Sequence, residues 1–524
     1  VTSGPGIATI TCFTSATMVT VDITAEFLGT ALTANDWTLA DSPQVPLKPS
    51  AKGTTGQSIT LTLTGLDGWR SNDVGKYVRI NRGLVLLTSV SSATAATGIV
   101  KADLDSDVEA PASSWTLESS VWDSSKGYPK ATTINQQRLV LAGTTRDPNG
   151  VWGSRSALYF DFTLGDEDTD GFFYALDGES NGIQHLASVR ALIALSLGTE
   201  WTMTGGVEKP LTPTNVQAKD QSVYGTTDVR PARIGDELAY VQRAGTSVLA
   251  MAFNVATDSY QSQELSTLSE HLLSMGVVDM AFQQRPIPVL WCICSDGTMA
   301  TMTISRSEGV IAWTSQDTQG GFESVAVIPA GDFDEVWVTV RRTINGQTRR
   351  YVERFNADAY THSAAFGSDP TGKATWTGLD HLEGMTVSIR ADGTVQPAQV
   401  ATGGQVTLAR NAKEVEFGLA VVLEVDLLSP EVVTQTGTAQ ARQMRAHEVD
   451  VLFLNTVGAT INGTAVNLRV FGDNVLDKPP PVNSGWGSVG ATGWRKGEMD
   501  TTITQPDPMP FHVLAVVRKW TTND

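Results

Sequence analysis

The chain is poor in the residues that most often carry covalent or metal-bound chemistry. Its 524 residues include only three cysteines and six histidines. Cys292 and Cys294 are two residues apart, so they would share one face of a strand, where a disulfide between them would be badly strained. No nearby His or Cys completes a metal site, so both are interpreted as small buried apolar residues. With Cys12, the low and odd count favours assembly in a reducing cytoplasm.

Long hydrophobic runs are also missing. The nearest, Ala191 to Leu197, is far short of the roughly 18 residues that a membrane helix needs. No basic-then-apolar signal peptide opens the chain, so no membrane span is expected. Since the sequence starts at Val1 without a methionine, we expect it to be the remainder of a longer precursor.

Positive charge is scarce. Lys and Arg number 37 against 56 Asp and Glu, which gives a net charge of -19. This balance argues against a basic groove that wraps DNA, because phosphate binding needs clustered Lys and Arg. An acidic surface repels phosphates, which suits a duct that DNA must pass without sticking. The 41% hydrophobic content is that of a folded chain, and the length predicts roughly three to four domains.

Strand signals dominate what is present. Val336 to Phe355 reads as two alternating runs joined by Asn345-Gly346, the strongest short-range sign of a type I′ hairpin. The same design recurs around Asp296-Gly297 and Asp392-Gly393. The one convincing helix is Ser266 to Met275, with Ser266 or Ser269 as its cap. The sequence therefore predicts an all-β chain.

The segment from Val121 to Phe162 is the most informative. It holds a Gly-Tyr-Pro turn, a strand that starts at Gln136-Gln137-Arg138, and a second turn at Asp147 to Gly150. It closes on Tyr159 to Phe162, interpreted as an aromatic strand, so the whole segment predicts a β-meander.

In residue types and order, this segment resembles the signature region of the nozzle proteins of short-tailed bacteriophages, also called tail tubular protein B. Asp73 to Ile80 looks like the small β-barrel that precedes the Gly-Tyr-Pro segment in that family. The further matches cover about residues 54 to 425 and follow in family order: GTEWTMTG (198–205), SVYG (222–225), VQRAG (241–245), SEHLL (269–273), LWCICSDG (290–297), Ala312-Trp313, Gly320 to Phe322, Tyr351 to Phe355, GLDHLEGM (378–385), Ala391 to Gly393 and Gly418-Leu419.

The resemblance implies a β-propeller flanked by small β-barrel or β-sandwich domains. Residues 1–53 would be platform or propeller strands, shorter than in relatives; 54–118 an inserted β-barrel; 119–366 the propeller-like core; and 367–524 a C-terminal β domain. It also implies a six-fold ring at the distal end of the virion tail, made in the host cytoplasm. An adaptor protein would sit above, fibres at the side, and genome DNA would pass non-specifically through the gated lumen.

Motifs for chemistry are weak. The absence of nucleophile elbows, phosphate loops and Cys-His pairs predicts a structural protein rather than an enzyme, with no cofactor. Asp166, Asp168, Asp170 and Asp177, with Gly171, occupy the offsets of a calcium loop, although the last ligand is usually Glu and acidic runs are usually solvated loops.

Other polar residues have structural interpretations. His271 and His381 are interpreted as structural hydrogen-bonding residues. The arginines of the 336–355 hairpin are expected to form a solvated face or one that makes salt bridges between subunits, rather than a DNA contact: Arg341, Arg342, Arg349 and Arg350.

Two other function classes remain open at this point. Tryptophans recur at irregular spacings, so repeat arithmetic alone leaves sandwich and propeller about equal. The runner-up is a receptor-binding or glycan-degrading tail protein, such as a spike or fibre, although those usually carry β-helical repeats that this chain lacks. The third is a cellular propeller, which regular blade spacing would favour.

Overall fold

The computed structural model describes residues 7–15, 18–25, 45–65, 68–124, 126–177, 181–206, 209–431, 433–434, 437–438, 442–468, 478–490, 493–496 and 499–523. The chain is all-β: across these residues the only α-helix is α1 (Glu270–Leu273), accompanied by the 3-10 turns η1 (Ser71–Asp73) and η2 (Asp380–Leu382). No helix of the described part is long and apolar enough to cross a membrane. The chain divides into two compact units, Val1–Tyr128 and Pro129–Asp524.

The first unit holds a six-stranded antiparallel sheet. Its strands run in the order β3 (Leu47–Pro49), β4 (Ser58–Leu63), β7 (Ala95–Ala102), β6 (Gly83–Val90), β5 (Tyr77–Ile80) and β8 (Thr116–Glu118). One face buries alternate side chains around Trp69 and Trp115, whose ring centroids are 5.9 Å apart. The sheet begins at Leu47, ahead of residue 54. The same unit holds a hairpin of β1 (Ile7–Ser15) and β2 (Met18–Ala25).

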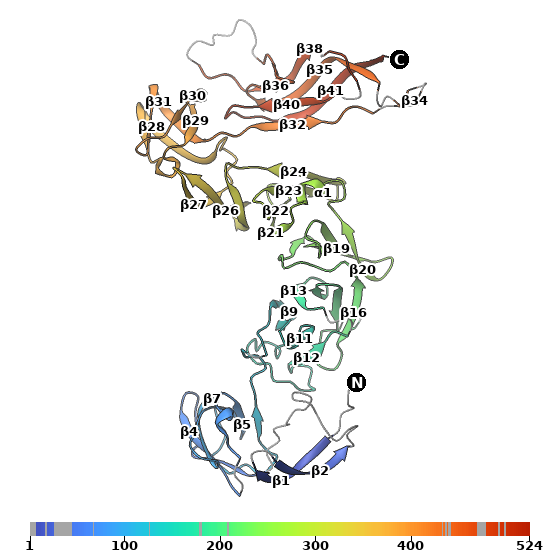
Figure 1. The fold of residues 1–524 in the computed structure, drawn as a ribbon, viewed down its shortest axis with the longest axis vertical. Helices are drawn as coiled ribbons and strands as arrows, with labels where there is room; N and C mark the ends of the chain where they lie inside the picture. The colour runs from blue at the N-terminus through green and yellow to red at the C-terminus, as the bar shows by residue number, and fades with distance from the viewer. Residues whose placement is uncertain are drawn as a thin grey trace. The chain divides into compact units, whose positions relative to one another are not determined.

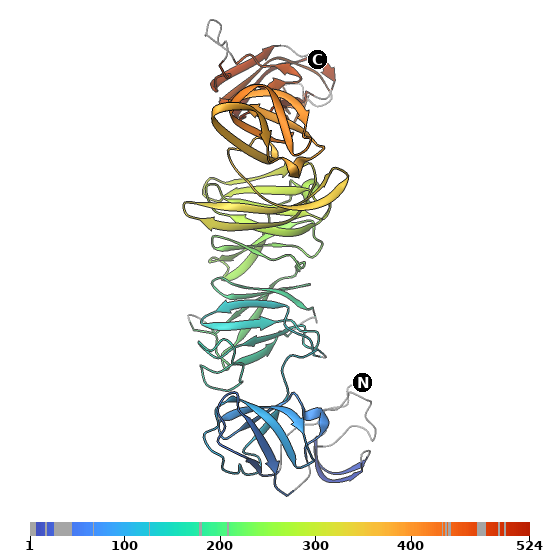
Figure 2. The same cartoon turned by 90° about the vertical axis from the view of Figure 1, so that its left-hand side faces the viewer.

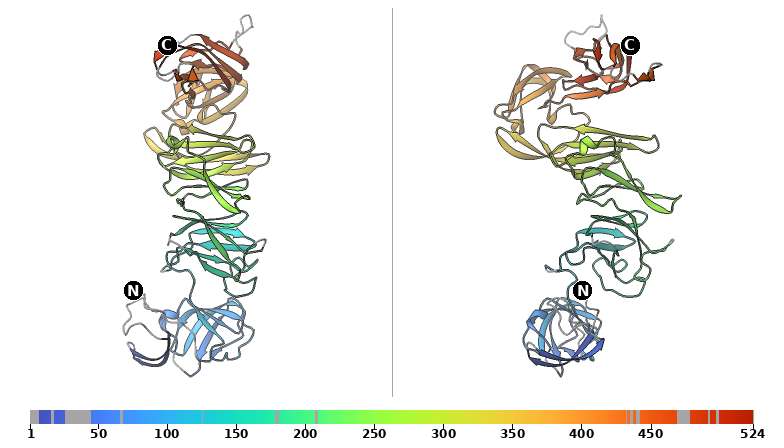
Figure 3. Two further views of the ribbon diagram at one scale, coloured as in Figure 1. Left: turned by 90° about the vertical axis from the view of Figure 1, so that its right-hand side faces the viewer. Right: turned by 45° about the vertical axis from the view of Figure 1, so that its right-hand side comes forward.

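The second unit opens with five antiparallel sheets in chain order, seen in Figure 1 from the strands around β9 to β26 and β27, and in the turned views of Figure 2 and Figure 3. The first four have four strands each, and the fifth has three. Their strands are β9 (Ala131–Asn135), β10 (Arg138–Ala142), β11 (Gly150–Gly153) and β12 (Phe172–Ala175); β13 (Ile183–Ser188), β14 (Leu192–Ser196), β15 (Glu200–Thr204) and β16 (Gln217–Ser222); β17 (Ala232–Ile234), β18 (Glu237–Val241), β19 (Val248–Asn254) and β20 (Ser259–Glu264); β21 (Val277–Gln283), β22 (Val289–Cys294), β23 (Met299–Ser305) and β24 (Val310–Gln316); and β25 (Gly321–Ala330), β26 (Phe333–Ile344) and β27 (Gln347–Arg354).

Each sheet packs face to face on the next, as blades of a β-propeller do. Four hydrophobic clusters join the first sheet to the second, the second to the third, and so on to the fifth. Strand β22 is buried on both faces because it lies between two neighbouring sheets. Cys292 and Cys294 belong to the cluster shared with the third sheet, while Trp291 and Ile293 belong to the cluster shared with the fifth. The prediction that both cysteines are small buried apolar residues is confirmed. The side chain of Cys12 lies outside the described residues.

Neighbouring sheets do not all contact each other through the same strands. The first strands of neighbouring sheets contact each other at three junctions, β9 with β13, β17 with β21 and β21 with β25. Between the second and third sheets it is the last strands, β16 and β20, that contact. In the described chain no hydrophobic cluster joins the first sheet to the fifth, so this propeller-like series is open.

Further sheets follow in the second unit. One has the order β28 (His362–Thr377), β31 (Gln405–Leu419), β29 (Thr386–Ala391) and β30 (Thr394–Val400). The C-terminal sheets comprise β32 (Leu423–Leu427), β40 (Thr501–Gln505), β36 (Thr460–Ile461) and β37 (Thr464–Ala465); β33 (Val433–Thr434) and β34 (Gly437–Thr438); and β38 (Asn483–Gly490), β35 (Gln443–Thr456), β39 (Arg495–Lys496) and β41 (Val513–Asn523). The domain divisions predicted at 118/119 and 366/367 stay predictions.

Most of the predicted turns are present. Asn345-Gly346 and Asp392-Gly393 have positive φ at both positions (47° and 72°, 48° and 71°), so both type I′ hairpins are confirmed. At Asp296-Gly297 only Gly297 has a positive φ, 89°, because the loop between β22 and β23 has four residues rather than two. The helix exists but covers only Glu270–Leu273, and its N-cap Ser269 makes no side-chain capping bond.

Two predictions for the 121–162 segment are wrong. Gln136 and Gln137 do not start a strand: with φ of 46° and 61° they form the tight turn between β9 and β10. Tyr159 to Phe162 is not a strand either: the Asp161 amide donates to the Leu158 oxygen at 3.1 Å, which closes a turn over Tyr159 and Phe160. The fourth strand of this sheet is β12 instead.

Candidate functional site

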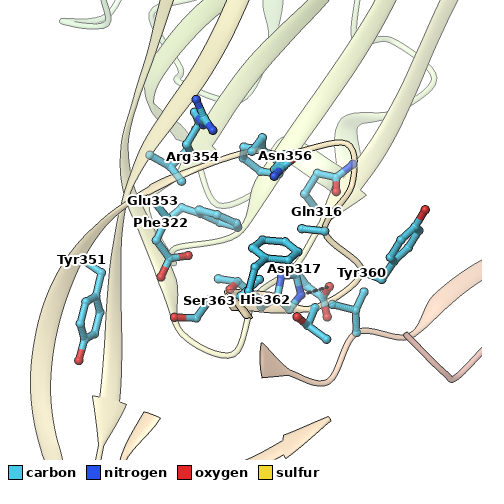
Figure 4. A pocket seen from close by; sticks show the side chains of 18 of the residues that line it. Gln316, Asp317, Phe322, Tyr351, Glu353, Arg354, Asn356, Tyr360, His362 and Ser363 are labelled. Carbon is cyan, nitrogen blue, oxygen red and sulfur yellow. Dashed lines mark ion pairs between the residues drawn. The ribbon is translucent and has the colours of Figure 1, made fainter. Parts of the chain in front are cut away.

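A pocket of about 580 Å³ opens in the second unit (Figure 4). It lies between the end of β24, strand β27, the segment that leads into β28, and the start of β32. Its walls are mixed: aromatic and aliphatic side chains alternate with almost as many polar and charged ones. Its lining residues include Asp317, Phe322, Tyr351, Glu353, Phe355 and His362.

His362 has an unused ring nitrogen. Its Nε2 lies 3.9 Å from Asp317 Oδ1, too far for a hydrogen bond, and this buried nitrogen has no hydrogen-bond partner among the described residues (Figure 4). Burial lowers the pKa of His362, the positive charge of Arg342 lowers it further, and Asp317 opposes both. The imidazole is therefore neutral at pH 7 and can donate or accept one further bond.

An ion pair between Arg342 and Glu353 lies near this histidine, and Glu353 lines the pocket. Arg342 is only 1% exposed, and its Nε and Nη2 donate to the two carboxylate oxygens of Glu353 at 2.8 and 2.6 Å. Its Nη1 also donates to the main-chain oxygen of Gln319 at 2.8 Å. Because Glu353 is committed to this pair, it is a poor candidate for a general acid or base.

A second buried carboxylate fixes the chain that leads into β28. Glu416 is 1% exposed and accepts bonds from the Tyr360 amide at 2.7 Å and from the Thr361 hydroxyl at 2.9 Å. Arg390 neutralises it at 3.0 Å and lies over the Tyr360 ring, 4.6 Å from its centroid. These contacts hold one wall of the pocket in place.

His381 also lines the pocket. Its Nε2 lies 3.1 Å from the main-chain oxygen of Ser363, a residue that adopts a left-handed φ of 52°. His381 therefore has a hydrogen-bond partner, but it also lines the pocket, so its purely structural role stays a prediction. His271 lies exposed in α1, and its predicted role stays a prediction.

The calcium-loop candidate is not assembled as a metal site. Asp170 Oδ1 instead pairs with Arg155 at 3.2 Å, and Arg138 donates to the main-chain oxygens of Asp168 and Asp170, in both cases at 2.5 Å. Asp177 lies exposed after β12. Within the described ranges, no group of three or more His, Cys, Asp or Glu side chains is arranged to hold a metal ion.

The arginines of the 336–355 hairpin are mostly paired within the chain. Arg342 is buried against Glu353, and Glu323 receives both Arg350 at 2.6 Å and Arg341 at 3.7 Å. Arg341, Arg342 and Arg350 are thus paired inside one chain, and Arg342 is buried rather than solvated. Salt bridges between subunits stay a prediction.

No sequence motif indicates the pocket itself. Its polar groups, such as Asp317, Glu353 and His362, come from three different elements, and none of them stands in a recognisable motif. The arrangement brings together an imidazole, carboxylates and aromatic surface, which are groups that can contact a bound molecule.

Comparisons with known proteins leave the family open. No protein-family model and no curated protein sequence matches the chain. Solved structures that it resembles include a streptogramin B lyase (9% identity over 61% of this chain and 86% of that one, TM-score 0.29). Others are a luciferin-regenerating enzyme (12%, 41% and 85%, TM-score 0.19) and an auxiliary nutrient binding protein from Bacteroides ovatus (9%, 62% and 89%, TM-score 0.25). Such low scores carry no argument about activity, and the propeller-like assignment is supported by the sheet order and packing above.

Proposed function

We propose that this chain is a structural virion protein, the tail nozzle of a short-tailed bacteriophage, rather than an enzyme. The observation that carries the proposal is the order of its parts. A six-stranded sheet precedes five stacked antiparallel sheets in the chain, and further antiparallel sheets follow them. That is the order that the sequence resemblance implies for an inserted barrel, a propeller and a C-terminal β region.

The matching sequence pieces also meet in space, which supports treating them as one signature. Glu200 of GTEWTMTG is fully buried and accepts bonds from the Ser222 hydroxyl at 2.6 Å and the Tyr224 amide at 3.3 Å, both in SVYG. The Arg243 amide of VQRAG donates to the Gly225 oxygen of SVYG at 3.0 Å. Three separated pieces thus build the junction between the second and third sheets.

Electrostatics supports a conduit for DNA. Each copy carries a net charge of -19, and a ring of six would surround its channel with acidic protein. Carboxylates that face the lumen would repel the phosphates and keep the duplex from sticking. Six copies would assemble below an adaptor ring and carry fibres at the side, and inward loops would gate the channel before ejection.

Native mass spectrometry of the purified chain, alone and with its tail adaptor, tests this proposal. We expect a species of six times the 55.9 kDa of one copy. Monomers in both samples at micromolar concentration would contradict the nozzle, and trimers would favour a spike or fibre. Incubation with host polysaccharide is the control for the glycan-degrading alternative, since a nozzle releases no oligosaccharide.

A further inference from the structure

In the described part of the chain, the fifth sheet has one strand fewer than each of its four predecessors. Each of those sheets has four strands, whereas the fifth ends at β27, which among the described strands pairs only with β26. An edge strand presents a row of unpaired amide and carbonyl groups, which proteins usually cover, charge or shorten. β27 is eight residues long, and six of its side chains are exposed.

The register identifies which main-chain groups point outward. The type I′ turn at Asn345-Gly346 makes Ile344 and Gln347 a hydrogen-bonded pair, and such pairs alternate along an antiparallel ladder. The amide and carbonyl groups that point away from β26 are therefore those of Thr348, Arg350, Val352 and Arg354. Val352 is 71% exposed, so its side chain does not cover the edge.

Apolar surface lies beside this edge. On one face of the sheet, Tyr351 lines the pocket together with Phe322 and Phe355. Across from that face, the side of β24 toward the fifth sheet carries Val310 and Ala312, both exposed. A fourth strand beside β27 would cover both surfaces with every second side chain.

The other face of the same edge carries excess positive charge. Arg341 and Arg350 share the single carboxylate of Glu323, at 3.7 and 2.6 Å. Arg354 is balanced by Glu335 alone. An acidic side chain opposite Arg350 would supply the missing counter-charge, because oppositely charged side chains that face each other across neighbouring strands attract.

We propose that β27 is a docking edge for an extended segment of a partner protein, which adds as the fourth strand of the fifth sheet. Its main chain pairs with the outward groups of β27. Its side chains alternate, apolar toward the pocket and β24, acidic toward Arg341 and Arg350. Main-chain pairing gives such sites their affinity, and the pocket and charges give specificity.

A labelled peptide tests the edge directly. The probe is a fluorescein-tagged seven-residue peptide in which valine or phenylalanine alternates with glutamate, followed by fluorescence anisotropy. We expect saturable binding that weakens about tenfold or more with Val352→Pro, because the proline removes an outward N–H that a partner strand would use. This N–H makes no bond to β26, so the thermal unfolding temperature should stay within a few degrees; Val352→Thr is the matched control and should bind as the wild type does.

Three outcomes would overturn the proposal. They are equal affinity for the Val352→Pro variant, equal affinity for a peptide N-methylated at alternate amides, and no binding at about 1 mM peptide. If the wild type self-associates and Val352→Pro abolishes this self-association, the strand that pairs with β27 comes from a second copy of this chain and not from a different partner. A peptide with lysine in place of glutamate should bind several-fold more weakly, and Arg350→Gln should remove part of that difference.

Discussion

Arg342 on β26 binds both carboxylate oxygens of Glu353 on β27, and its guanidinium is almost completely buried. The two residues lie on one face of the fifth sheet, where Glu353 lines the pocket. The pair therefore ties the edge strand to the middle strand by side chains as well as by the ladder.

Removing one partner of this pair should be far more damaging than removing both. We expect Glu353→Ala to destabilise the chain by about 3–5 kcal/mol, because it leaves a buried guanidinium with only the Gln319 carbonyl. The double variant Arg342→Met with Glu353→Leu should recover most of that loss. Urea denaturation followed by tryptophan fluorescence measures both, and equal losses would show that the pair is not electrostatically coupled.

Protonation of His362 should lower the free energy of unfolding in mild acid. Burial lowers its pKa below the ordinary value of about 6.5 that it has in the unfolded chain, so the folded state holds the neutral ring. The resulting stabilisation is fully present above that ordinary value and is lost as pH falls through the folded pKa. His362→Gln should remove this part of the pH dependence between about pH 7 and 5, and an unchanged pH dependence of unfolding in this variant would contradict the assignment.

Ionisation of Glu200 should lower the free energy of unfolding as the pH rises, the opposite pH dependence to that of His362. Its burial raises its pKa, although bonds from Ser222 and the Tyr224 amide oppose the shift. A raised pKa gives stability that is present below the unfolded value and is lost as pH rises through the folded value. We expect the unfolding free energy of Glu200→Gln relative to wild type to rise with pH from about 4 to 7, by at most about 1.4 kcal/mol per unit. A constant difference would contradict this assignment.

The turn at Gln136-Gln137 should be improvable. Gln137 holds a φ of 61°, which costs an L-residue about 1–2 kcal/mol, so Gln137→Gly should stabilise the chain by roughly 0.5–1 kcal/mol. Gln136→Gly should gain less, because its side chain accepts a bond from the Leu211 amide at 2.8 Å. Thermal unfolding of the two variants compares them, and the reverse order would show that the turn is not strained at Gln137.

Much of the strand pattern could be predicted from local chemistry. Asn-Gly and Asp-Gly dipeptides supply the positive φ that tight hairpins need, and they mark the hairpins at 345 and 392. The two-residue spacing of Cys292 and Cys294 placed both on one buried face. Gln136-Gln137 gave no such signal, because glutamine has no preference for positive φ, and only the register of β9 and β10 forces that turn.

The pocket and the open edge could not be predicted in this way. The pocket collects residues from Gln316 to Met509, and their meeting depends on how four segments of the second unit pack. Likewise, β27 reads as an ordinary hairpin arm. Its unpaired edge appears only when the five sheets are compared, because strand number is a property of the sheet rather than of the segment.

Negative-stain electron microscopy of the purified chain, alone and mixed with tail components, tests the central proposal most directly. A nozzle predicts class averages with six-fold symmetry and a central channel, whether formed unaided or only with the adaptor. Three-fold particles, or lone monomers in both samples, would contradict it.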